Sequence, residues 1–186
     1  MLLSARNNQF LFNFPRTFIP KHIADKYRPY LNKMPGNMIT EPIDYLNYGI
    51  QSLNLPGPTY DPVTQTDFPG NVRKFRSSLP LSTTDEPMEM TVTMQAFDGY
   101  VNYWMAREVF QYYYVQDGKV PYVPEGVGIQ VMDSEGIIFV TCKMHRMLYQ
   151  GLSALDLNFS SNTVEFQTFD MTFVYNDLEI VVDLDG

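Results

Sequence analysis

The side chains of this sequence that could perform acid–base chemistry are two carboxylate pairs and a histidine. Asp133 and Glu135 lie in the turn-like segment D-S-E-G, and Asp117 and Glu125 lie in the glycine- and proline-containing segment before it. Cleavage of a glycosidic bond requires two carboxyl groups that converge on that bond, whereas carboxylates in turns are usually solvated. His145, in CKMHRMLYQ, is typical of the surface end of a strand. These residues do not predict a catalytic site.

Motifs that carry other chemistry are also missing. The sequence has no P-loop, GxGxxG, HExxH or GxSxG motif. Its two histidines, His22 and His145, are far apart, and its single cysteine, Cys142, lies in the apolar run IIFVTCKM, where a small packing residue is expected. We therefore predict no enzyme activity, no cofactor and no metal site.

Charge divides the chain into two unlike halves. Residues 1–87 hold nine Lys/Arg and seven Asp/Glu, whereas residues 88–186 hold four and fourteen. An acidic body disfavours tight binding to nucleic acid, because phosphates are neutralised by Lys and Arg. The more basic first half could instead contact the acidic half of a neighbouring copy, although solvated surface charge is the commoner explanation.

Prolines mark the same division, since eleven of the thirteen lie between Pro15 and Pro87. Proline interrupts regular ladders, so the first half should be rich in loops. We predict a single domain, 1–186, with an N-terminal arm (1–44) and a β-sandwich (45–180) that contains an extended loop (57–87). No apolar run is long enough to span a membrane, and no signal-type segment opens the chain, which predicts a soluble protein without a membrane anchor.

The elements that must position these residues follow from the hydrophobic pattern. We expect strands at 10–14, 49–55, 88–95, 127–131, 137–143, 152–159 and 169–175, and a last extended segment in LEIVVDLDG. We also expect a possible helix around 20–31, a helical turn from Glu41 and a convincing helix at about 98–116.

Two of these strands alternate with a period of two, which places unlike side chains on their two faces. The large apolar residues are expected in the core, and a small, polar, partly acidic set is left on the other face. The apolar set is Met88, Met90, Val92, Phe169, Met171 and Phe173, and the polar set is Glu89, Thr91, Thr93, Thr168, Asp170 and Thr172.

The helix at 98–116 is apolar on both sides. Tyr103, Ala106, Val109, Phe110 and Tyr113 form the face expected to close the core. The far side carries further large residues, and we predict that Trp104, Met105 and Tyr112 contact a neighbouring subunit. The alternative is that the proline-rich first half folds back over this side.

The loop 57–87 contains aromatic residues and a basic cluster. We predict that this loop is an arm that becomes ordered against a partner, and the alternative is a mobile surface loop. The prediction rests on Tyr60, Phe68, Arg73, Lys74 and Arg76.

Three segments together resemble the tail tube proteins of contractile-tailed bacteriophages. The segment GLSALDLNFSSNTVEFQTFDMTFVYND is similar to the C-terminal part of that family, with Gln167 to Thr172 matching its closing strand. SLNLPG (52–57) resembles its early strand that ends in a Pro-Gly turn, and MEMTVTMQAFDGYVNYWMAREVFQYYY its strand-plus-helix unit. The order of elements agrees over roughly 45–180.

The resemblance implies a mainly β (α+β) fold, an antiparallel β-sandwich or barrel flanked by one helix. It also implies a virion protein that forms hexameric rings, which stack into the inner tail tube and contact the sheath or other tail proteins. Double-stranded DNA would pass through without specific binding during genome ejection. The polar set of Glu89, Thr91, Thr93, Thr168, Asp170 and Thr172 would then face the lumen.

Two alternatives remain open. The arm at 15–44 and the loop at 57–87 are longer than the family pattern, which leaves room for a tube-initiating or tube-terminating ring. A β-sandwich that binds a glycan or a receptor through Tyr112, Tyr113, Tyr114 and Tyr122 is the other.

Overall fold

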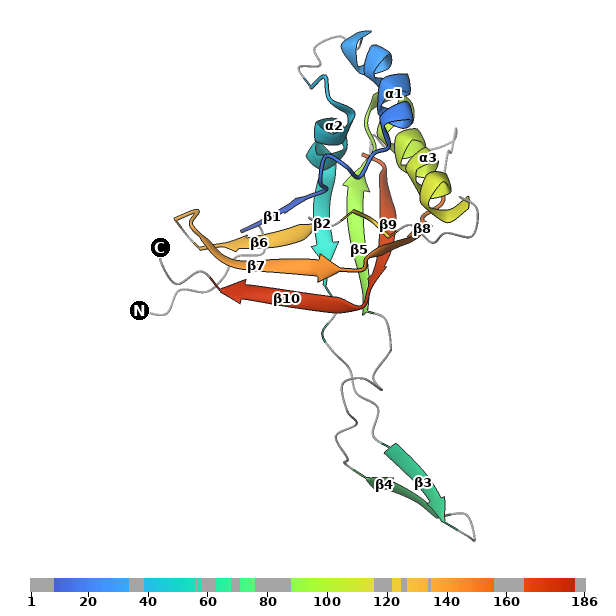
Figure 1. Ribbon diagram of the computed structural model, residues 1–186, viewed down its shortest axis with the longest axis vertical. Coiled ribbons are helices and arrows are strands. Elements are labelled where there is room, and N and C mark those ends of the chain that lie inside the picture. The colour runs from blue at the N-terminus through green and yellow to red at the C-terminus, as the bar shows by residue number, and fades with distance from the viewer. Residues whose placement is uncertain are drawn as a thin grey trace.

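Two four-stranded antiparallel sheets and three α-helices make up the fold (Figure 1). The computed structural model of the chain describes residues 9–33, 39–55, 57, 63–67, 71–75, 88–115, 122–124, 127–133, 135–155 and 166–182. The helices are α1 (Lys21–Lys33), α2 (Pro42–Tyr48) and α3 (Val101–Val115), the last preceded by a 3-10 turn at Asp98–Tyr100.

The sheets differ in their strand order. Sheet A is β1 (Phe10–Asn13), β6 (Gly128–Met132), β7 (Ile138–His145) and β10 (Asp177–Val182), in that order. Sheet B is β2 (Ile50–Asn54), β5 (Met88–Gln95), β9 (Thr168–Tyr175) and β8 (Leu148–Leu152). A separate hairpin joins β3 (Val63–Asp67) to β4 (Asn71–Phe75).

The period-two pattern of the central strands sets the core face of sheet B. Met90 lies opposite Phe173 and Val92 opposite Met171 in the β5–β9 register, and all four are fully buried. The intervening threonines and carboxylates lie on the other face. The predicted assignment of the two faces of these strands is therefore confirmed.

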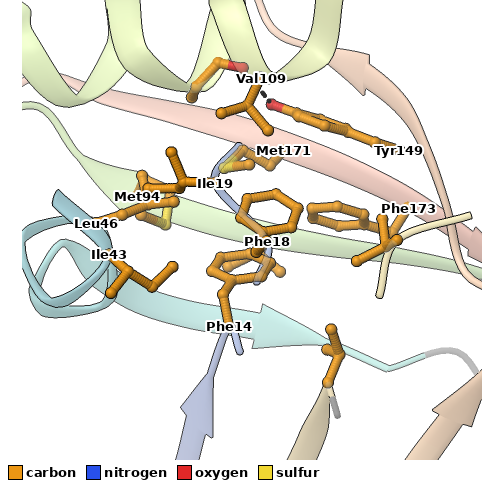
Figure 2. Close-up of a cluster of buried hydrophobic side chains, with 14 of the residues drawn as sticks. Phe14, Phe18, Ile19, Ile43, Leu46, Met94, Val109, Tyr149, Met171 and Phe173 are labelled. Carbon is orange, nitrogen blue, oxygen red and sulfur yellow. Dashed lines mark hydrogen bonds between the residues drawn. The ribbon is translucent and has the colours of Figure 1, made fainter. Parts of the chain in front are cut away.

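Aromatic rings fill the space over this apolar face (Figure 2). Phe14 and Phe18, from the segment between β1 and α1, stack with ring centroids 4.5 Å apart. Tyr149 of β8 stacks on Phe173 at 4.8 Å, and Ile43 and Leu46 of α2 close the side of the cluster. Each such ring pair contributes about 0.5–1.5 kcal/mol beyond its burial.

Sheet A joins the same core at one end of its strands. Phe12, Ile129, Cys142 and Met144 share one face and are buried. The burial of the free thiol of Cys142 confirms its predicted packing role. In Figure 1 the strands of sheet A run across those of sheet B, as in an orthogonal sandwich.

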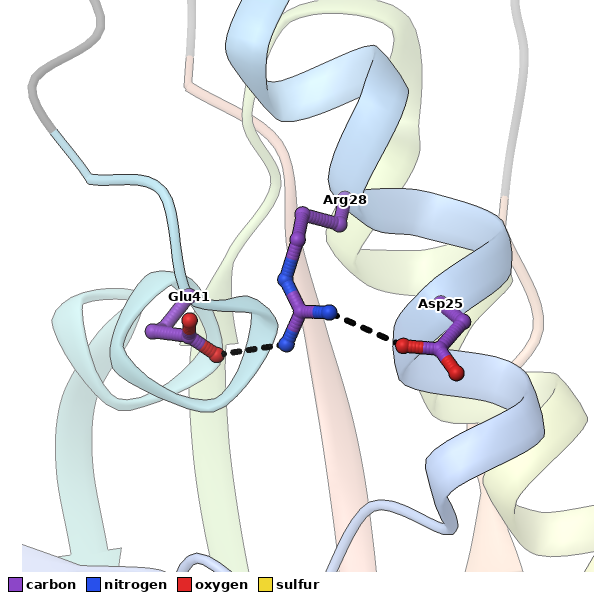
Figure 3. A network of polar contacts seen from close by, with 3 residues as sticks. All are labelled: Asp25, Arg28 and Glu41. Carbon is purple, nitrogen blue, oxygen red and sulfur yellow. Dashed lines mark hydrogen bonds and ion pairs between the residues drawn. The ribbon is translucent and has the colours of Figure 1, made fainter.

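The first part of the chain folds back over one side of α3, which was the open alternative. The Tyr27 hydroxyl of α1 donates to Glu108 of α3 at 3.0 Å, and Lys26 forms an ion pair with the same carboxylate. Figure 3 shows Arg28 between Asp25 and Glu41, at 2.8 and 3.0 Å, which ties α1 to the start of α2.

The mainly β (α+β) class is confirmed, and three details differ from expectation. The strand expected at 152–159 is instead β8, at Leu148–Leu152, and residues 156–159 lie outside the described part. Arg146 adopts a left-handed backbone (φ +52°) and turns the chain directly from β7 into β8, a conformation that few non-glycine residues adopt and that no pattern signalled. The expected loop 57–87 contains the β3–β4 hairpin, and the helix at 98–116 is regular only from Val101.

Candidate assembly surfaces

The first candidate surface is the polar face of sheet B. Thr93 and Asp170 lie opposite each other, and the threonine hydroxyl donates to the carboxylate at 2.8 Å. Thr91 lies opposite Thr172. These four side chains are half-buried, whereas Glu89 and Thr168, at opposite ends of the pair of strands, are exposed.

This face carries negative charge without positive charge. Ser52 and Asn54 of β2 continue it beside Thr93 and Thr91. Among its described residues there is no lysine or arginine, and Glu89 and Asp170 are its charged groups. The six residues predicted to line a lumen thus share one hydroxyl-rich, acidic face, while their place in a lumen stays a prediction.

The second candidate surface is the outer end of sheet A, which sequence reasoning missed. The apolar face that buries Ile129 and Cys142 continues outward past the core and becomes exposed. The opposite face also carries exposed apolar side chains there, beside the polar Gln130 and Thr141. We call this end the sheet A tip: Val131, Ile138, Ile180 and Val182 on the core-side face, and Leu11, Phe139 and Val181 on the other.

A sheet end that is apolar on both faces is normally covered on both faces. Ile180 is 61% exposed and Phe139 is 52% exposed. The signal for this was present in the runs IIFV and LEIVV, since continuous apolar stretches are typical of strands buried on two sides. A hollow of about 510 Å³ on the Leu11 side of sheet A, next to the tip, is lined by Gln130, Thr141, Lys143 and Glu179 among others.

Helix α3 supplies the third surface, but only part of it lies where expected. Trp104 is 40% exposed, with Arg107 over its ring and Tyr103 edge-on against it. Met105, predicted at a subunit interface, is fully buried in the chain's own core, and α1, α2 and β8 all pack against α3. Tyr112 is half-buried and contacts the ring of His22. A neighbouring subunit can therefore reach Trp104 but not Met105.

The predicted arm is described only as a backbone hairpin. Arg73 and Lys74 lie on β4, paired with Gln65 and Thr64 of β3. Tyr60, Phe68 and Arg76 lie outside the described residues. Figure 1 places the hairpin apart from both sheets.

The side chains considered for catalysis have structural partners or lie outside the described part. Asp133 accepts hydrogen bonds from the backbone N–H groups of Glu135 and Ile137, which is turn capping. His145 lies 3.2 Å from Glu179 in an exposed pair. Asp117 and Glu125 are not described. Within the described residues there is no group of three side chains able to hold a metal ion.

The tyrosines of the binding-module alternative do not form one surface. Tyr113 is buried and its hydroxyl donates to the Phe18 carbonyl at 2.8 Å, and burial raises its pKa well above the usual value. Tyr114 is exposed and stacks on Phe110, and Tyr122 is exposed. One of the four is therefore unavailable to a ligand. In the part of the chain that is described, no helix is both long and apolar enough to cross a membrane.

Comparison with known proteins finds similar structures but no similar sequences. No protein-family model matches, and no curated protein matches. The anti-feeding prophage cap, a tube terminating cap, matches with a TM-score of 0.54 and 11% identity over 98% of this chain and 94% of that chain. The anti-feeding prophage baseplate matches with a TM-score of 0.49 and 13% identity over 98% of each chain. The sheath-tube complex of an extracellular contractile injection system matches with a TM-score of 0.48 and 14% identity over 72% of this chain and 81% of that chain. At this level of identity, the first of these matches shows that the chain shares its fold with a tube terminating cap.

Proposed function

We propose that this chain is a structural ring subunit of the inner tube of a phage tail or a related contractile injection particle. The observation that carries the proposal is the sheet A tip, which is apolar on two faces and which nothing in the described chain covers. A soluble chain with such a tip gains stability when further copies cover it. The proposal also accounts for the sheet edges that the described residues leave open, because such edges invite pairing with other chains.

Sheet B has the topology that a closed ring requires. Its edge strands, β2 and β8, are separated by three antiparallel pairings, so they run in opposite directions. A head-to-tail ring that lays β8 of one copy beside β2 of the next therefore continues the antiparallel order. Six copies of a four-stranded sheet give a barrel of about 24 strands.

Such a barrel has a usable channel. At about 4.8 Å between strands it is roughly 37 Å across at the backbone, and strand tilt widens it further. Side chains take about 5 Å on each side, half the spacing of packed sheets, which leaves a channel of about 27 Å. That width is sufficient for a DNA duplex.

The polar face of sheet B suits the inside of this channel. Glu89 and Asp170 repeat around the wall, among threonine hydroxyls and without cations. Phosphates find no Lys or Arg to bind on such a wall, so DNA would slide without being held.

Rings must also stack, and the β3–β4 hairpin with its basic residues is our candidate for that contact. Arg73, Lys74 and Arg76 would face acidic groups of the next ring, and added salt would weaken the contact. If stacking is unchanged when all three residues are replaced by glutamate, the hairpin does not supply this contact.

A tube-terminating ring is the second candidate, favoured by the shared fold with a tube terminating cap over 98% of this chain. The two roles differ in one measurable property. A tube subunit should polymerise into long tubes by itself, whereas a terminating ring should stop at single rings that bind the end of a tube.

Electron microscopy of the purified protein, combined with light scattering, tests the proposal. Rings or tubes with a central hole support it, and their length separates the two roles. A stable monomer at high protein concentration, with an exposed tip, refutes ring formation.

A further inference from the structure

The sheet A tip projects from one side of the molecule. Figure 1 shows the strands of sheet A running past β2, the left-hand edge of sheet B, to the turn that joins β6 to β7. Cys142 is the last buried residue of β7 toward this turn, and the strand begins four residues further out, at Ile138. Four residues of a strand span about 13 Å. The tip is therefore long enough to lie on a neighbouring copy.

The outermost turn of the tip combines apolar side chains with negative charge. Ile137 and Phe139 are exposed there. Asp133 and Glu135 lie in the same turn, and neither carboxylate forms an ion pair with another described residue. The surface that covers this end should therefore offer apolar contact area and a cation.

One described surface of the chain offers both. Tyr114, near the end of α3, is exposed and stacks on Phe110, which packs edge-on against Tyr149 of β8. Tyr122 is exposed as well, and the next residue donates its backbone N–H to the carbonyl of Met147, at 2.7 Å, just before β8. Two large rings thus lie beside the β8 edge of sheet B.

The cation of this surface lies at the corner between β7 and β8. Arg146 is exposed, and it forms no ion pair within the part of the chain that the structure describes. Gln150, exposed at the irregular pairing of β8 with β9, adds a polar group. We call this surface the β8 flank: Tyr114, Tyr122, Arg146 and Gln150. Tyrosine and arginine are the residue types that protein interfaces favour.

The tip and the β8 flank lie on opposite sides of the molecule. The tip extends beyond β2, and the flank lies beside β8, at the other edge of sheet B (Figure 1). A contact between opposite sides of two copies joins unlike surfaces, and it repeats from copy to copy around a ring. Sheet A and α3 both pack on the core side of sheet B, so this contact leaves the polar face of sheet B free.

We propose that the sheet A tip of one copy packs against the β8 flank of the next copy. The apolar side chains of the tip cover the two tyrosine rings, and Glu135 faces Arg146. This inference rests on the proposed ring and deepens it by naming a contact between neighbours. In that ring β2 of one copy lies beside β8 of the next, and the tip reaches past this shared edge.

Charge exchange tests the polar part of the contact. Glu135→Lys and Arg146→Glu should each raise the protein concentration needed for assembly about two- to tenfold, and a chain carrying both changes should recover to within about twofold of the parent. The eight residues of β7 separate the two positions by about 26 Å within one copy, so recovery has to come from contact between copies. A double variant that assembles no better than the single ones overturns the proposal.

Two controls accompany these variants. Arg146 has a left-handed backbone, so its replacement could disturb the corner itself. Arg146→Lys carries the same backbone cost but keeps the charge, and it should assemble within about twofold of the parent. Lys33→Glu reverses a charge at the exposed end of α1 and should change nothing. If Arg146→Lys weakens assembly as much as Arg146→Glu, the charge of Arg146 does not make the contact.

The apolar part of the contact is tested at Tyr114. Tyr114→Ala should raise the concentration needed for assembly at least fivefold, because an exposed ring that becomes buried at an interface contributes strongly to binding. Tyr30→Ala removes an exposed ring from α1 and should leave assembly unchanged. Equal assembly of the two variants contradicts the packing of the tip on the flank.

Cross-linking tests which surfaces meet. An Ile137→Cys chain and a longer, tagged Gln150→Cys chain are assembled together and treated with a short bis-maleimide linker. We expect a heterodimer band at least five times stronger than with the control pair, Ile137→Cys and Lys33→Cys. The parent chain controls for the buried Cys142. Bands of equal strength show that the tip lies elsewhere and overturn the proposal.

The same measurements separate this inference from the proposed function. If the parent forms rings, and the Glu135 and Arg146 variants form them at the parent's concentration, the contact is wrong and the ring function stands. If the parent never assembles, both fail. Rings from the parent, weaker assembly of each single variant and recovery in the double variant support both.

Discussion

Replacing Ile180 by aspartate changes the most exposed aliphatic side chain of the sheet A tip without touching the core. Ile180 is 61% exposed on the edge strand β10. Full burial of an isoleucine contributes about 1.5–3 kcal/mol, so covering the exposed part contributes about 1–2 kcal/mol to each contact between copies. An unpaired carboxylate in that contact adds a desolvation penalty of a few kcal/mol.

The sum is about 3–5 kcal/mol per contact, which lowers the association constant about a hundred- to several-thousand-fold. The free subunit should be much less affected, within about 1 kcal/mol, because exposed edge positions tolerate polar residues. Sedimentation velocity should therefore show monomers where the parent chain forms rings, with nearly equal thermal unfolding.

The matched control is Tyr30→Asp on α1, because Tyr30 is 62% exposed and lies away from the tip. It should leave assembly unchanged. If Ile180→Asp assembles at the same concentration as the parent, or if both variants fail equally, the tip is not the surface that holds copies together.

Three other predictions address the hydrophobic core, the polar face of sheet B and the dependence of stability on pH. Met171→Ala should lower the free energy of unfolding by about 2–5 kcal/mol, measured by urea denaturation, because Met171 is fully buried between β5 and the helices. Glu89→Lys combined with Thr168→Lys should leave rings intact, since both side chains are exposed, but should make them retain DNA in a gel-shift assay; rings that still ignore DNA would show that this face does not line the channel. Burial raises the pKa of Tyr113, so above pH 10 the unfolded chain releases a proton that the folded chain keeps, and stability should fall by about 1.4 kcal/mol per pH unit. In Tyr113→Phe that alkaline slope, followed by denaturation at several pH values, should be shallower, and an equal slope would contradict the assignment.

The two central strands of sheet B, β5 and β9, could be predicted from the sequence because their information is local. The alternation of Met90 and Val92 with threonines on β5 has a single solution in which one face is buried. The end of β7 could not be predicted in the same way. The chain turns there at Arg146, whose left-handed backbone leaves no mark in the hydrophobic pattern.

The burial of Met105 shows a second limit of prediction from sequence. A hydrophobic pattern identifies the apolar faces of a helix but not the segment that covers each face. The pattern of α3 correctly showed a helix that is apolar on two sides, but it could not say what covers the second side. Here Met105 is fully buried within the chain, and α1 packs against α3 through contacts such as the Tyr27–Glu108 hydrogen bond between residues distant in sequence. Trp104, one residue earlier, is 40% exposed.

The sheet A tip is a stronger sign of a binding partner than the exposed ring of Trp104. An exposed ring such as Trp104 is common on single proteins and needs no partner. The sheet A tip exposes large apolar side chains on both faces, with Phe139 on one side and Ile180 on the other, and an exposed apolar edge of this kind favours pairing with another chain. Covering one face alone would still leave the other exposed. The head-to-tail arrangement that we propose would place a copy on each face.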